Sequence, residues 1–226
     1  MTGPPRAALV RELQGMQDDL LRLGTMVDQA IESAMRSLER RDPPLAQAVV
    51  TGDAAVNALR FRIEEDALTL IATQQPAAVD LRAVMAAFSI VSDLERMGDH
   101  AAGIARTVLR MGDEPLLKPL IDLPRMAEIC RGMLRQSLQA FVDRDAEAAR
   151  HIARQDDVID GLYHQVFREL LSFMVEDPRT TTRALYLLFS AHNLERIGDR
   201  ITNVVERIIF MTSGEMRELN PEPPEA

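Results

Sequence analysis

The sequence predicts an all-α protein built from two tandem three-helix bundles that are related by an internal duplication. Three observations lead to this prediction: helix-forming residues dominate the composition, apolar residues recur at three- and four-residue steps, and a seven-residue motif occurs twice. Only 12 prolines and 11 glycines occur in 226 residues. Apolar residues make up 46% of the chain, which is enough for a buried core.

The first half shows three amphipathic segments separated by proline-containing turns. The opening pattern of apolar residues stops at Asp42-Pro43-Pro44, and the second stops at Gln74-Gln75-Pro76. The segment from Gly112 to Pro124 is poor in helix formers, and we interpret it as a linker. The helices are therefore expected over residues 9–38, 45–72 and 78–111.

The second half repeats this order. Asp42 corresponds to Asp145 and Asp53 to Asp156, 103 residues apart in both cases, and the offset falls to 100 at the repeated motif. Helices are expected over 126–141, 145–175 and 178–211, with a short deletion near Pro178. We place the two repeats at 6–112 and 122–211, and we expect the Pro- and Glu-rich tail 212–226 to be disordered.

Charge and cysteine content restrict the function. The net charge of −9 and the absence of a Lys/Arg-rich run argue against nucleic acid and against direct attraction to an anionic membrane. Cys130 is the single cysteine, so no internal disulfide is possible. No signal-peptide core precedes Leu13, and no apolar stretch reaches the length of about 18 residues that a membrane helix needs. We expect a cytoplasmic protein that meets membranes only through partners.

The repeated motif carries an acidic pair in each half. Residues 93–99 (DLERMGD) and 193–199 (NLERIGD) share five of seven residues. A helix turns by about 100° per residue, so carboxylates four positions apart lie on one face. That face is otherwise apolar. Like-charged groups there are costly unless they are protonated, hydrogen-bonded or given a cation.

The second helix of each half supplies further polar side chains with the same four-residue spacing. We therefore predict two cation sites, each formed between two adjacent helices. Arg96 and Arg196 are the alternative, because they can neutralise the carboxylates without a metal. Gly98 and Gly198 indicate either points where another helix or an ion comes close, or packing glycines that the helix tolerates. The predicted ligands are Asp53, Asn57, Glu95 and Asp99 in the first half, and Asp156, Asp160, Glu195 and Asp199 in the second.

Both motifs, together with Asp80-Leu81-Arg82 and the segment 53–57 (DAAVN), resemble the PhoU family over about residues 9–211. The resemblance implies cytoplasmic proteins of two similar three-helix bundles, some of which bind multinuclear clusters of iron or another metal (zinc, magnesium or manganese). Asn57 departs from the acidic pattern of that family. The resemblance also implies homo-oligomers and a regulatory role, in which the protein links the phosphate ABC transporter to a sensor histidine kinase and represses phosphate-starvation genes.

Two other functions compete with this non-enzymatic adaptor. A carboxylate-bundle oxidoreductase or hydrolase would use Glu-x-x-His, and no Glu here has a His three residues later. A metal-free structural protein would pair its acidic motifs with arginines alone.

Overall fold

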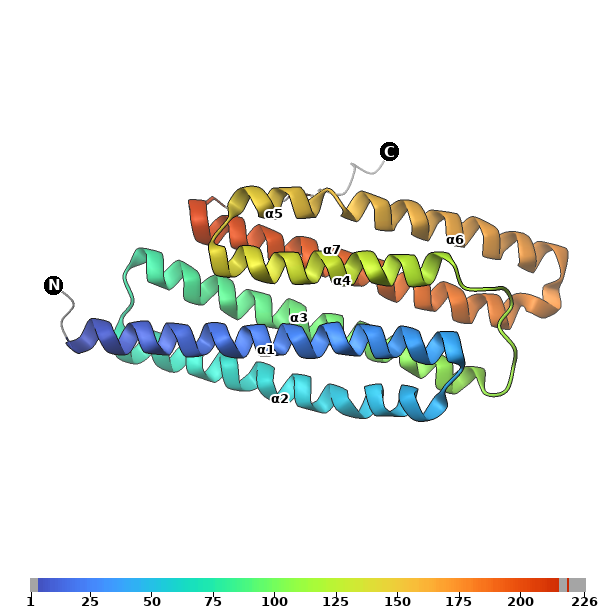
Figure 1. The fold of residues 1–226 in the computed structure, drawn as a ribbon, viewed down its shortest axis with the longest axis horizontal. Coiled ribbons are helices and arrows are strands. Elements are labelled where there is room, and N and C mark those ends of the chain that lie inside the picture. The colour runs from blue at the N-terminus through green and yellow to red at the C-terminus, as the bar shows by residue number, and fades with distance from the viewer. Residues whose placement is uncertain (1–3, 216–218, 220–226) are drawn as a thin grey trace.

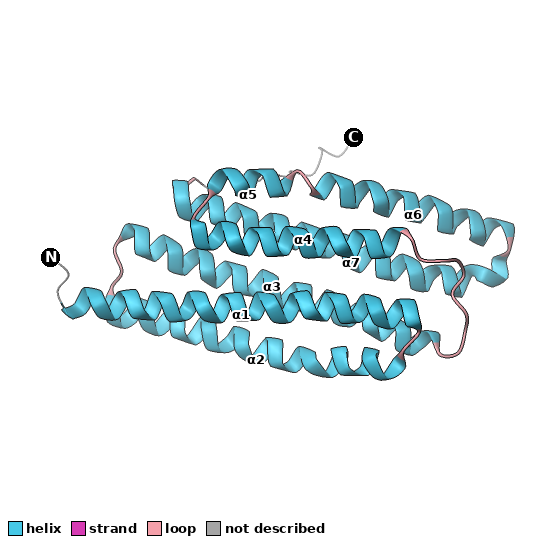
Figure 2. Cartoon of the chain, in the orientation of Figure 1, coloured by secondary structure: helices cyan, strands magenta, loops and turns pink. Residues whose placement is uncertain are grey.

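The computed structural model of the protein describes residues 4–215 and Leu219. This part of the chain consists of helices and loops and contains no strand (Figure 2). The all-α prediction is confirmed. The elements are α1 (Pro4–Arg40), α2 (Pro43–Gln74), α3 (Ala78–Met111), α4 (Asp122–Asp143), α5 (Ala146–Ala153), α6 (Asp156–Glu176), the 3-10 helix η1 (Pro178–Thr180) and α7 (Thr181–Ser213).

Equivalent turns in the two halves are built by equivalent residues. Arg41 and Arg144, 103 positions apart, both adopt a positive φ (50° and 53°). Each is followed by an aspartate that caps the next helix: Asp42 accepts a hydrogen bond from the backbone N–H of Leu45, and Asp145 accepts two from the start of α5. Such caps satisfy the free N–H groups at a helix start. The duplication therefore extends to the turn chemistry.

The two halves lie side by side and share one hydrophobic core. Helices α3 and α7 run along each other between the halves, and α1 packs against α4 (Figure 1). Arg131 of α4 donates hydrogen bonds to Asp28 of α1 at 2.9 and 3.0 Å. The long helices α3 and α7, which carry the two acidic motifs, are consequently the central elements of the molecule.

The second helix of the second half is expected to be continuous over 145–175, and this expectation is wrong at one point. Helix α5 ends at Ala153, and α6 begins at Asp156 after two intervening residues. The N–H of Gln155 donates to the carbonyl of Ile152 at 2.9 Å, which closes a tight turn. The Gln155 side chain also donates to Gln136 of α4 at 3.2 Å. This contact between elements favours the break, which puts Asp156 at the positive end of the α6 dipole.

The linker and the chain end are more ordered than their composition suggests. Lys118 forms an ion pair with Glu169 of α6, so the linker is held against the second half. Helix α7 continues to Ser213, and the N–H of Leu219 donates to Glu206 at 2.8 Å. The remainder of the tail that we expected to be disordered, 216–218 and 220–226, lies outside the described residues.

Candidate cation sites

Four carboxylates of the second half face one another between α6 and α7. Asp156 and Asp160 lie on α6, and Glu195 and Asp199 lie on α7. Asp156 is only 2% exposed. The charges are close enough to interact, because Asp199, Asp160 and Asp156 each raise the pKa of Glu195, and Asp199 also raises that of Asp160. The structure thus brings together the four residues that the sequence assigned to the second site.

Burial and mutual repulsion change the ionisation of this cluster. Burial is the main cause that raises the pKa of Glu195 to about 7, the charge of Asp199 is the next, and Arg196 acts in the opposite direction. Burial also raises the pKa values of Asp160 and Asp199. Oε2 of Glu195 is buried and accepts no hydrogen bond from the described residues, although His192 Nδ1 lies 3.3 Å from Glu195 Oε2. The cluster is short of positive charge.

Arg196 supplies part of the missing charge. Its Nη1 donates to Asp199 Oδ2 at 2.8 Å, as the alternative of an arginine partner requires. Asp156 is held differently, because Thr202 Oγ1 donates to Asp156 Oδ2 at 3.1 Å. Arg200 also lowers the pKa of Asp199, yet burial outweighs these positive charges and the pKa values of Asp199 and Glu195 stay raised.

Gly198 permits the close approach of α6 to α7. A β-carbon at this position would lie 2.6 Å from Asp156 Oδ1 and 3.0 Å from Ile159 Cδ1, both closer than such atoms normally come. At the equivalent Gly98, a β-carbon would lie 3.4 Å from Asp53 Oδ1. The prediction that a neighbouring helix comes close to the two glycines is confirmed.

The first-half residues also meet between α2 and α3, with weaker charge. Burial raises the pKa of Asp53, the charge of Asp99 adds to this, and Arg106 opposes it. Asn57 Nδ2 donates to Asp53 Oδ2 at 3.3 Å. Asp99 itself is exposed. The amide of Asn57, which hydrogen-bonds Asp53, thus stands where the second half has its fourth acid, Asp160.

Arg60 is the main difference between the two sites. Its guanidinium donates to Glu95 Oε1 at 3.2 Å and to Glu64 Oε1 at 2.8 Å, and it lies over the ring of Phe61. The equivalent position in the second half is Tyr163, which carries no positive charge. Glu95 is therefore paired directly with an arginine, whereas among the described residues the carboxylate of Glu195 has an ion-pair contact only with His192.

Arg60 was not among the residues predicted from the sequence, although a signal was present. Arg60 follows Asp53 by seven residues, a spacing that places both side chains on one face of α2. Arg96 and Arg196 were the only cationic partners that we expected from the sequence. The contact of His192 with Glu195 was missed as well, because no shared spacing distinguished the histidines.

The donor set fits a hard divalent cation, since carboxylate oxygens are the ligands that magnesium, manganese and iron accept readily. The buried Oε2 of Glu195 is an acceptor that such an ion would satisfy. In the described part of the chain, no three His, Cys, Asp or Glu side chains already have the arrangement of a metal site. A bound cation would therefore require these side chains to change rotamer.

Comparison with known proteins identifies the family. Residues 20–108 and 123–208 each match the family model of the PhoU domain. The chain belongs to the PhoU family. The phosphate-specific transport system accessory protein PhoU homolog of Aquifex aeolicus is 38% identical over 92% of this chain and 94% of its own. The homolog of Caulobacter vibrioides is 40% identical over 90% and 89%, respectively.

Solved PhoU structures share the fold. The crystal structure of PhoU from Pseudomonas aeruginosa superposes with a TM-score of 0.87 at 32% identity, and it covers 91% of this chain and 99% of its own. The phosphate transport system regulatory protein PhoU from Streptococcus pneumoniae gives 0.86 at 32% identity, with coverage of 92% and 99%. Each half of this chain is thus a PhoU domain. Among the described residues, no helix has the length and apolar character required to cross a membrane.

Proposed function

We propose that this chain regulates phosphate transport as a cytoplasmic, non-enzymatic adaptor between the phosphate ABC transporter and a sensor histidine kinase. The supporting observation is its similarity, over nearly the full length of both chains, to relatives named as phosphate-specific transport system accessory proteins. Within this proposal the partners are the ATPase subunit of the transporter and the kinase. The protein acts as a homodimer or a higher homo-oligomer and represses phosphate-starvation genes when phosphate is plentiful.

Exposed apolar side chains on α6 and α7 support a role in protein binding. Phe167 and Leu171 are 44% and 47% exposed on α6, and Phe189 is 52% exposed on α7. Tyr163, four residues before Phe167, lies across the same helix pair from His192, three residues after Phe189, with ring centroids 6.1 Å apart. Such surfaces commonly mediate protein contacts. A regulator must bind two states of its partner unequally, since equal affinity shifts no equilibrium.

Deletion of the gene tests this function. Cells that lack the protein should express phosphate-starvation genes and take up phosphate at an altered rate even in high phosphate, and the wild-type gene should restore repression. Capture from native membranes with the tagged protein should retain the transporter ATPase subunit and the kinase. Unchanged repression and uptake in the deletion strain would contradict the proposal.

We also propose that the second-half carboxylates hold a divalent cation or a multinuclear cluster, with the first-half set as a weaker site. The uncompensated charge around Glu195 supports this assignment. Asp156, Asp160, Glu195 and Asp199 would be the ligands. A cation bound there would neutralise the cluster and link α6 to α7, while Arg196 would still balance the outer oxygen of Asp199.

Elemental analysis of protein purified without added metal tests the cation site. Iron, zinc, magnesium or manganese should be present in the wild type and depleted in Glu195→Ala and Asp199→Ala, while Glu128→Ala, an exposed acid outside both clusters, should keep the wild-type content. No metal in any of the four proteins would favour the metal-free alternative, and equal metal content in all four would contradict the assignment of these carboxylates as ligands. Oxygen consumption by the iron-loaded protein that Asp199→Ala abolishes would instead favour an enzyme.

A further inference from the structure

The linker between the two halves places one positive charge between α4 and α6. Lys118 is the single lysine of the chain, and its side chain is only 9% exposed. It forms an ion pair with Glu169 of α6, and its Nζ lies 3.9 Å from Oδ2 of Asp122 at the start of α4. Together with Gln165 of α6, these residues line a cavity of about 420 Å³. One ammonium group thus balances a carboxylate of each helix.

In the first half the equivalent carboxylate is paired with a residue of the neighbouring helix. Asp122 corresponds to Asp19 of α1 and Gln165 to Arg62 of α2, each 103 residues apart. Arg62 Nη2 donates to Asp19 Oδ1 at 2.7 Å. Because Gln165 carries no charge, the second half takes this cation from the linker instead.

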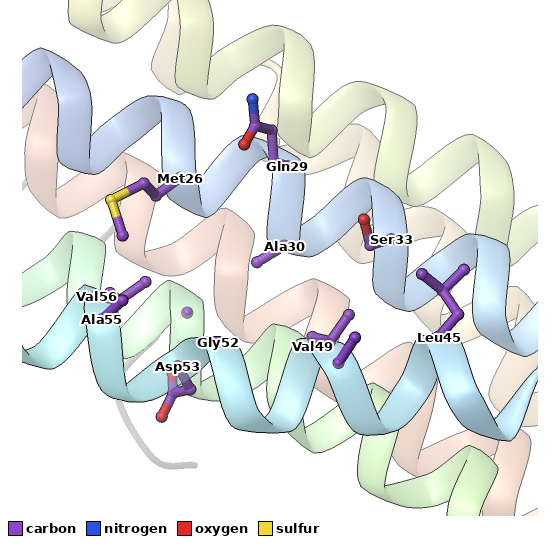
Figure 3. Close-up of a pocket in the computed structure, with 12 residues that line it drawn as sticks. Met26, Gln29, Ala30, Ser33, Leu45, Val49, Gly52, Asp53, Ala55 and Val56 are labelled. Atoms are coloured by element: carbon purple, nitrogen blue, oxygen red, sulfur yellow. The ribbon is translucent and has the colours of Figure 1, made fainter.

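Helix packing also differs between the halves. Helix α1 begins at Pro4 and lies along α2, and Figure 3 shows Met26 of α1 opposite Val56 of α2. Helix α4 begins only at Asp122, and it packs mainly on α7 and α1 and only slightly on α6. Residues 112–121 of the linker correspond in sequence to residues 9–18 of α1. The linker therefore replaces several turns of helix that support α2 in the first half.

The other end of the linker is attached to the first half. Arg41, in the turn between α1 and α2, donates from Nη1 to the carbonyls of Asp113 and Glu114, at 3.4 Å each. Leu120 is partly buried against the core. Figure 1 shows the linker passing from the end of α3 to the start of α4. Residues 113–121, which we call the strap, thus contact both halves.

We propose that the strap is a regulatory element and that Lys118 is its latch: the ion pair holds α6 against α4, and its opening loosens α6. Without the ammonium group, the largely buried carboxylate of Asp122 would lie close to that of Glu169, and the two would repel each other. A strap with a closed and an open form supplies the two states that a regulator needs.

The latch also bears on the cation site that we propose in the second half. Helix α6 carries two of the four ligands, Asp156 and Asp160, so a loosened α6 holds them less precisely against α7. The effect on cation binding rests on that proposed site, whereas the effect on α6 itself does not. The two effects are therefore measured separately.

Hydrogen exchange of the full-length protein in the presence of a chelator tests the strap without metal. Lys118→Gln should make residues 165–176 exchange about tenfold faster, because the loss of a charged hydrogen bond favours local opening. Lys118→Arg keeps the charge and should retain the wild-type exchange. Thermal unfolding checks that each variant folds. If Lys118→Gln does not fold, Glu169→Gln removes the same ion pair at its more exposed end.

Two further variants separate the strap from an ordinary ion pair. Arg62→Gln is the matched control in the first half, since it introduces the residue that Gln165 represents there. Helix α2 should stay protected in this variant, because α1 packs along it. Lys118→Gln combined with Gln165→Arg returns a cation to α6 itself. This double variant should restore the protection of α6, while the strap remains fast in exchange.

Manganese titration of the same variants measures the effect on the cation site. Lys118→Gln should weaken manganese binding in the second half several-fold, and the added Gln165→Arg should restore it. Unchanged exchange of α6 in Lys118→Gln, or equal loosening of α2 in Arg62→Gln, would overturn the proposed latch. Faster exchange with unchanged manganese affinity would overturn its link to the cation site. Absence of manganese binding in the wild type would contradict the cation site alone, and the exchange rates would still decide on the strap.

Discussion

His100 Nδ1 of α3 lies 3.0 Å from Asn193 Oδ1 of α7, and the duplication gives this contact a counterpart of different charge. Asn193 corresponds to Asp93 and His100 to Arg200, each 100 residues apart. In the counterpart, Arg200 Nη1 lies 3.5 Å from Asp93 Oδ1. The two halves thus meet through a pair of related contacts, one between an imidazole and an amide and one between two charges.

We expect Asp93→Ala to destabilise the protein more than Asn193→Ala. The side chains of Asp93 and Arg200 are 13% and 18% exposed, so loss of the carboxylate leaves a largely buried guanidinium without its ionic partner. Burial raises the pKa of Asp93 against the attraction of Arg200, so we place the loss at about 1–3 kcal/mol, against about 1 kcal/mol for the neutral hydrogen bond of Asn193. Urea unfolding at neutral pH measures both values. Equal losses would mean that charge contributes nothing to the contact between the halves.

In the metal-free protein, Glu195→Gln should become stabilising as the pH rises. The pKa of Glu195 is raised from 4.5 to about 7, so the folded state holds this proton more tightly than the unfolded chain does. Stability is therefore lost between pH 4.5 and 7, as the carboxylate ionises inside the cluster. The variant avoids this loss, which we place on the order of 1–2 kcal/mol above pH 7 after allowance for partial solvent screening.

Glu95→Gln is the matched control and should have the opposite effect. Glu95 accepts a hydrogen bond from Arg60, so removal of its charge weakens an ion pair instead of relieving repulsion. Chemical unfolding of both variants and the wild type at pH 5 and pH 8 gives the comparison. A stabilising Glu95→Gln, or a Glu195→Gln that destabilises at pH 8, would contradict this difference, in which Glu95 is paired with Arg60 and Glu195 is repelled by neighbouring carboxylates.

Gly198→Ala and Gly98→Ala test the close approach of the helices. A β-carbon 2.6 Å from Asp156 Oδ1 must displace that carboxylate, and we expect a loss of about 1–3 kcal/mol together with lower metal content. At Gly98 the contacts are 3.3 Å or longer, so the gain of about 1 kcal/mol in helix propensity should offset most of the strain. Similar effects of the two substitutions on thermal stability would contradict this difference.

Most of the fold was predictable because apolar periodicity and proline turns act locally. The start of α3 at Ala78 and its end at Met111 match the expected boundaries, since the preceding Gln-Pro turn and the following Gly112 determine them. The break between α5 and α6 was not predictable. It involves the contact between Gln155 and Gln136 of another helix, which lie 19 residues apart, and no local pattern reports it.

The candidate site was predictable as a set of residues but not as a balance of charge. Helical spacing placed the carboxylates on facing stripes, and the structure brings them together. Which of them are neutralised depends on longer side chains that reach across from another position, as Arg60 does to Glu95. Rotamers decide such contacts, and spacing alone leaves them open. The asymmetry between the two halves was therefore recognised in the sequence only at Asn57, although the exchange of Arg60 for Tyr163 was also present there.

The difference between Arg60 and Tyr163 also predicts that exchanging these two residues changes metal binding at the two proposed sites. Arg60 and Tyr163 occupy equivalent positions, and the guanidinium of Arg60 holds Glu95 as a bound cation would. Tyr163→Arg should place a positive charge near Glu195 and lower the metal content of the second half. Arg60→Tyr should free Glu95 and increase metal binding in the first half.

Manganese titration followed by electron paramagnetic resonance counts the ions bound by each variant. Tyr163→Phe is the control, because it removes only a hydroxyl and should retain the wild-type stoichiometry. If Tyr163→Arg bound as much manganese as Tyr163→Phe, charge compensation by the chain could not explain the difference between the sites. If Arg60→Tyr gained no ion, the amide of Asn57 would be the remaining cause, because Asn57 stands where the second half has the carboxylate of Asp160.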